Sequence, residues 1–83
     1  MSAYFVVQSF SKNQKGYVQP DIPIQAQSAA HARKVAERLA KIRTAVVAFS
    51  RKGDPLTGEF DDAEVIATHG ELPEQVREAM GMA

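Results

Sequence analysis

The chain has 83 residues, no cysteine, and ten basic against ten acidic side chains, so its formal net charge is zero. A chain this short builds one hydrophobic core, and we expect residues 1–83 to form a single small domain. The lack of cysteine excludes a disulfide-stapled secreted scaffold and a cysteine-based zinc module. The N-terminus has no signal-peptide pattern and no apolar run approaches about 20 residues, so we expect a soluble, cytoplasmic protein without membrane contact.

The charges are distributed unevenly along the chain. Residues 1–52 contain nine Lys or Arg against two Asp or Glu, and residues 53–83 contain one against eight. The two halves therefore carry net charges of +7 and −7. Folding decides whether this separation in the sequence becomes a separation in space.

The first predicted strand is Ala3–Phe10, a segment rich in aromatic and β-branched residues. It carries apolar side chains on both faces, as a central or doubly covered strand does. Phe5 and Val7 share one face, and the other face has Tyr4, Val6 and Phe10. These five residues are the candidate interface, because whichever set points away from the main helix needs a second cover.

A polar connection ending at Gly16 predicts a hairpin to a second strand, Tyr17–Gln27. Apolar and polar residues alternate in this strand, which predicts one apolar side made of Val18, Ile22, Ile24 and Ala26. Proline cannot donate a ladder hydrogen bond. Pro20 and Pro23 therefore confine the strand to a sheet edge or split it at Asp21.

The segment Ser28–Arg43 predicts the one long helix of the chain. Ser28 is a suitable N-cap residue. Apolar residues then recur at intervals of three and four, which places them on one stripe facing the core: Ala29, Ala32, Val35, Ala36, Leu39 and Ile42. The remaining circumference is mostly basic.

The second half of the chain predicts a second hairpin. Thr44–Ser50 is apolar on both faces and predicts a third, central strand. Residues 51–62 contain two Gly, a Pro and four acids and predict a loop. Ala63–His69 predicts the fourth strand. Residues 71–83 predict a short helix or frayed tail that starts at Pro73 and has an apolar face of Leu72, Val76 and Met80.

This order predicts an α+β two-layer sandwich. Two hairpins flank one main helix, so the expected fold is a four-stranded, mainly antiparallel sheet of β-β-α-β-β order, with a short C-terminal helix and the main helix on one face.

No pattern in the chain predicts catalysis, a metal site or a cofactor. The serines lack a G-x-S-x-G context, and His31 and His69 have no partner at metal-ligand spacing. A calcium loop beginning at Asp54 would need oxygen ligands where Leu56 and Gly58 stand. A looser carboxylate site in this acidic loop is the remaining metal alternative. We therefore expect neither an enzyme nor a resident cofactor.

Two functional hypotheses remain. The first is a protein-interaction or structural module that forms a homodimer or binds a protein partner through the uncovered sheet face or an edge strand. The alternative is a nucleic-acid-binding accessory domain, because a basic helix face can neutralise phosphates. The candidate contacts for that role are Arg33, Lys34, Arg38, Lys41 and Arg43.

Overall fold

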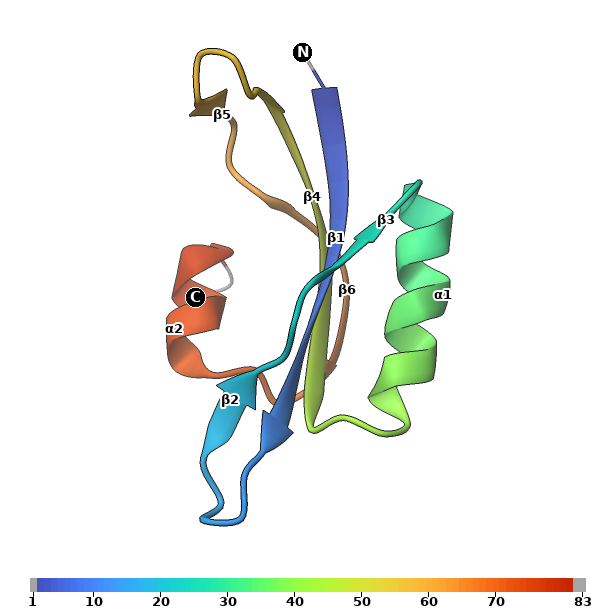
Figure 1. The fold of residues 1–83 in the computed structure, drawn as a ribbon, viewed down its shortest axis with the longest axis vertical. Helices are drawn as coiled ribbons and strands as arrows, with labels where there is room; N and C mark the ends of the chain where they lie inside the picture. Colours follow the sequence, from blue (N-terminus) through green and yellow to red (C-terminus); the bar gives the residue numbers. More distant parts are fainter. Residues whose placement is uncertain (1, 82–83) are drawn as a thin grey trace.

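One antiparallel sheet organises the chain in the computed structural model, which describes residues 2–81 (Figure 1). The two central strands are β1 (Ser2–Lys12) and β4 (Ala45–Asp54), which pair from Ser2 opposite Gly53 to Phe10 opposite Ala45. The edges beside β1 are β2 (Val18–Pro20) and β3 (Ile24–Ala26), and those beside β4 are β5 (Glu59–Phe60) and β6 (Glu64–Gly70). The predicted α+β class and the antiparallel sheet are confirmed.

The main helix, α1 (Ala29–Ala40), joins β3 to β4 and covers one face of the sheet (Figure 1). Its start is fixed by Ser28, whose Oγ accepts a hydrogen bond from the His31 N–H at 3.1 Å. Ala32 and Ala36 are buried, and these small side chains let the helix backbone approach the sheet closely. The predicted N-cap and the helix are confirmed.

The prediction that Ile42 belongs to the buried apolar stripe of the helix is wrong. Helix α1 ends at Ala40, and the N–H groups of Ile42 and Arg43 both bond to the Leu39 carbonyl as the chain turns away. Ile42 therefore leaves the helical stripe and is 71% exposed. Leu39 keeps its predicted contact with the core and is half-buried.

The predicted second strand is split, and its apolar side is divided between two faces. Pro20 lies opposite Phe10, whereas Ile24 lies opposite Val7, so one extra residue separates the two pairings on the edge side. A shift by one residue moves side chains to the other face. Val18 thus lies on the face of Phe10, while Ala26 is buried beneath α1.

The predicted loop at residues 51–62 is also shorter than expected. β4 continues through Arg51 and Lys52 because β1 begins at Ser2 and provides pairing partners there. Gly53 then pairs with Phe60, and Asp54 with Glu59. Only residues 55–58 form the turn of this β4–β5 hairpin.

Two clusters of buried side chains lie on opposite faces of the sheet. The cluster beneath α1 consists of Val7, Ala26, Ala32, Ala36, Val46 and Ala48. The other cluster consists of Phe10, Ala45, Val47 and Leu72, with Phe49 and Val76 packed against it. The short helix α2 (Glu74–Ala79) supplies Val76, so the chain covers part of its second sheet face itself.

The predicted C-terminal helix is thereby confirmed as α2, while residues 82 and 83 of the predicted tail lie outside the described part. Neither helix within residues 2–81 has the length and apolar character needed to cross a membrane.

Candidate interaction surface

The structure divides the five candidate interface residues between the two sheet faces. Phe5 and Val7 pack in the cluster beneath α1. Phe10 belongs to the cluster beneath α2. Tyr4 and Val6 share the face of Phe10 because side chains alternate along β1, and both are half-buried. The set that points away from α1 is therefore Tyr4, Val6 and Phe10.

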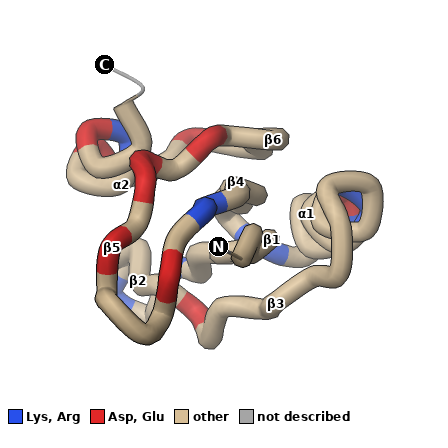
Figure 2. Tube along the Cα trace, turned by 90° about the horizontal axis from the view of Figure 1, so that it is seen from above, with Lys and Arg blue, Asp and Glu red and all other residues tan. Residues whose placement is uncertain are grey.

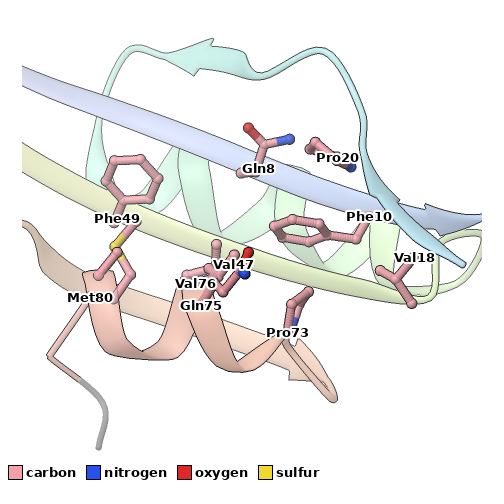
Figure 3. A pocket seen from close by; sticks show the side chains of 11 residues that line it. Gln8, Phe10, Val18, Pro20, Val47, Phe49, Pro73, Gln75, Val76 and Met80 are labelled. Carbon is pink, nitrogen blue, oxygen red and sulfur yellow. The ribbon is translucent and has the colours of Figure 1, made fainter.

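A groove of about 370 Å³ lies on this second face, between α2 and strands β1 and β2 (Figure 3). The floor comes from Phe10, Val47 and Phe49, and the two walls come from β2 and α2. The complete lining is Gln8, Phe10, Val18, Pro20, Val47, Phe49, Pro73, Gln75, Val76, Ala79 and Met80. None of these side chains is charged, and ligand pockets are often apolar with few polar groups and measure roughly 300–1,000 Å³.

Two carboxamides are the polar groups of the groove. The Gln8 Nε2 donates hydrogen bonds to the backbone carbonyls of Ser9 and Asp21, which fixes this amide on β1. Gln75 stands on α2 and is exposed. The Gln8 Nε2 is therefore already bonded within the chain, whereas Gln75 is an exposed polar side chain at the α2 side of the groove.

The same face ends in an aromatic cluster at the β4–β5 hairpin. The rings of Tyr4 and Phe60 lie 6.0 Å apart at an interplanar angle of 52°. The Arg51 guanidinium lies 5.7 Å from the centre of the Phe60 ring. Gly53 is required beneath this ring, because a Cβ atom at residue 53 would overlap it. Phe60 remains 41% exposed, so apolar surface continues beyond the groove.

The predicted basic surface lies at α1, on the other side of the sheet. Arg33, Lys34, Arg38, Lys41 and Arg43 are all exposed. The acidic residues of the second half lie mainly along β5, the link to β6, and α2, away from α1 (Figure 2). The basic residues of α1 are therefore separated in space from the acidic residues of the second half, whereas the other basic residues of the first half lie on β1, the β1–β2 turn and β4: Lys12, Lys15, Arg51 and Lys52.

Arg43 differs from the other four cations because it takes part in a local polar cluster. Its Nε lies 3.7 Å from Asp21 Oδ2, the single ion pair found within residues 2–81. The hydroxyl of buried Ser9 donates to the same carboxylate at 3.0 Å, and that of Ser11 donates at 2.9 Å. This cluster joins the link between β2 and β3 to β1 and to the link between α1 and β4.

No group of three metal-ligating side chains occurs in the described part of the chain, residues 2–81. His31 instead accepts a hydrogen bond at Nδ1 from the Gln27 N–H, at 3.1 Å. Asp54 organises its own turn by accepting from the Leu56 N–H at Oδ1 and from the Gly58 N–H at its carbonyl.

The groove includes residues that the sequence did not identify as a site, among them Gln8, Gln75 and Phe49. One signal was available: Gln8 is a polar residue on the strand face that otherwise carries Tyr4, Val6 and Phe10. Comparisons of the chain with protein-family models, with curated proteins and with solved structures found no match. The functional proposal below is therefore based on this surface.

Proposed function

We propose that this chain is a small protein-interaction module that self-associates through the sheet face opposite α1. The observation that supports this proposal is the uncharged groove between α2, β1 and β2. Apolar surface exposed to water on a folded domain favours association, because its burial against a partner is stabilising by roughly 25 cal/mol per Å². A second copy carries the same surface, and a two-fold interface would use it on both chains.

The surface also has the composition of a protein interface. Aromatic and methionine side chains are enriched in the cores of such interfaces, whereas charged side chains are depleted there. The groove contributes Phe49 and Met80, and the surface next to it contributes Tyr4 of β1 and Phe60 of β5. The charged residues of α2, Glu74, Arg77 and Glu78, do not line the groove.

A bulky charge placed in the groove tests this function. Ala79 is an exposed residue of α2 that lines the groove, so Ala79→Arg should fill the space and prevent association. Ala30→Arg is the matched control, because Ala30 is an exposed residue of α1 on the other side of the sheet. Sedimentation equilibrium should show a monomer for Ala79→Arg and unchanged association for Ala30→Arg. Equal behaviour of the two variants would contradict the proposal.

Nucleic-acid binding through α1 is the second candidate function. It is supported by the exposed cations Arg33, Lys34, Arg38 and Lys41, which have no acidic partner within salt-bridge distance among residues 2–81. Binding by such contacts weakens as salt rises, with a slope of log K against log salt of about −0.9 for each phosphate contacted on duplex DNA. Replacing the four cations by Gln should flatten this slope. Failure of the unmodified chain to bind duplex or single strands in dilute salt would exclude this function.

A further inference from the structure

One large apolar side chain projects from the end of the molecule at the β4–β5 hairpin. Leu56 is 94% exposed and stands in the turn of the β4–β5 hairpin. It is the most exposed of the large apolar side chains within the described residues. The transfer of such an exposed apolar side chain from water into an apolar site is favourable in free energy.

Hydrogen bonds to Asp54 close the turn that carries Leu56. Asp54 Oδ1 accepts from the Leu56 N–H at 2.9 Å, and the Asp54 carbonyl accepts from the Gly58 N–H at 2.8 Å. Gly58 adopts a φ of +75°, which a glycine accommodates without strain. Pro55 fixes its own φ. A turn that is closed by its own hydrogen bonds and contains a proline loses less conformational entropy on binding, which favours its insertion into a partner.

The hairpin tip lies at one end of the long axis of the molecule, on the same side of the sheet as α2, whereas α2 and the groove beside it lie nearer the middle of that axis (Figure 1). That axis measures 40 Å. A two-fold axis placed between the hairpin tip and the groove would bring each tip close to the groove of the other copy, giving two equivalent junctions in one closed dimer.

The charges around the hairpin tip are complementary to those on the β1–β2 side of the groove. The hairpin and the link that follows it carry Asp54, Glu59, Asp61 and Asp62. The β1–β2 hairpin at the groove carries Lys12 and Lys15, and Lys12 lines a hollow that shares Val18 and Pro73 with the groove. Glu71 and Glu74 lie at the opposite wall of that hollow. An acidic tip is therefore favoured along the strand wall and disfavoured along the start of α2.

We infer that the occupant of the groove is the β4–β5 hairpin tip of a second copy, with Leu56 inserted between β2 and α2. This inference rests on the proposed self-association and specifies its interface. Leu56 fills apolar space beside Phe10 and Phe49, and the acids around the tip lie near Lys12 and Lys15 of the partner copy.

Two variants and their mixture test this arrangement by sedimentation. Leu56→Glu should raise the dissociation constant by about tenfold or more, since the lost burial of a leucine side chain has that effect. Ile42→Glu is the control, because Ile42 is also largely exposed but lies at the end of α1. Ala79→Arg blocks the groove instead of the tip. A mixture of Leu56→Glu and Ala79→Arg chains should associate more strongly than either variant alone, because one intact tip still meets one intact groove.

The other outcomes contradict either this inference alone or both the inference and the proposed function. If Leu56→Glu associates like the parent while Ala79→Arg does not, the groove takes a different segment, and the proposed self-association survives. If both variants are monomeric and their mixture also stays monomeric, reciprocal insertion is wrong. If the unmodified chain is monomeric at every concentration, both the inference and the proposed function are wrong.

Discussion

Truncation of Leu39 measures how much one side chain of α1 contributes to the free energy of unfolding of this small domain. It packs against the cluster beneath α1 but is only half-buried, so Leu39→Ala should cost toward the lower end of the range for leucine truncation, about 2 kcal/mol. Lys34 is an exposed residue of the same helix, and Lys34→Ala should change the free energy of unfolding by less than about 0.5 kcal/mol. Chemical denaturation of both variants measures the difference. Equal stabilities would mean that the α1 contact with the sheet is misplaced.

Asp21 is the second residue whose role can be isolated. Its carboxylate accepts from the hydroxyl of Ser9, which is buried, so Asp21→Ala would leave that donor without its partner and cost about 1–3 kcal/mol. Arg43→Gln removes only the exposed ion pair and should cost no more than about 1 kcal/mol. Thermal unfolding of the two variants distinguishes the contributions. A larger effect of Arg43→Gln would show that the ion pair, and not the hydroxyl contacts, stabilises this link.

At the scale of elements, α2 should be the least stable helix. It has six residues, no fully buried side chain and no side-chain N-cap, whereas α1 has twelve residues and the Ser28 cap. Helices shorter than about 12–15 residues are marginal without tertiary packing. Amide hydrogen exchange should therefore be faster in α2 than in α1 and β4.

Self-association adds a condition to this prediction. If a second copy packs beside α2, exchange in α2 should become slower as the protein concentration rises, while exchange in α1 should not change. Protection of α2 equal to that of α1 at every dilution would contradict both statements.

The sequence predicted those elements whose signals are local. The α1 helix follows from Ser28 and from the three-and-four spacing of its apolar residues, and the split edge strand follows from Pro20 and Pro23. The division of Val18 and Ala26 between two faces was not predictable from alternation, because the extra residue in the link has no periodic signature. The extension of β4 depends on pairing with Ser2 and Ala3, which lie far away in the sequence.

The groove was even less accessible to sequence reasoning. It joins side chains from β1, β2, β4 and α2, which are brought together only by the folded chain. The sequence showed apolar residues on both faces of the first strand but did not show which set lies opposite α1; the structure places Tyr4, Val6 and Phe10 there. How much of the second sheet face α2 covers depends on the path of the chain from β6 through Leu72, and no local sequence pattern specifies that path.

Across the whole molecule, the exposed circumference of α1 is mainly basic, whereas β5, the link to β6 and α2 are mainly acidic (Figure 2). The apolar groove lies beside α2, on the sheet face opposite α1. The two candidate functions thus use different faces and respond differently to change. Replacing the α1 cations should leave self-association intact, and blocking the groove should leave any phosphate binding intact. Salt screens exposed charges beyond about 8 Å at physiological ionic strength, so it should weaken nucleic-acid binding more than burial of an apolar groove.

The most direct test of the central claim is sedimentation equilibrium of the unmodified chain and of Ala79→Arg across a dilution series. We expect the mass of the unmodified chain to rise from one copy toward two as concentration increases. Ala79→Arg should stay at one copy while keeping the circular dichroism spectrum of the parent. A constant single-copy mass for the unmodified chain, or association of Ala79→Arg equal to that of the parent, would contradict the claim that the groove beside α2 is an interface.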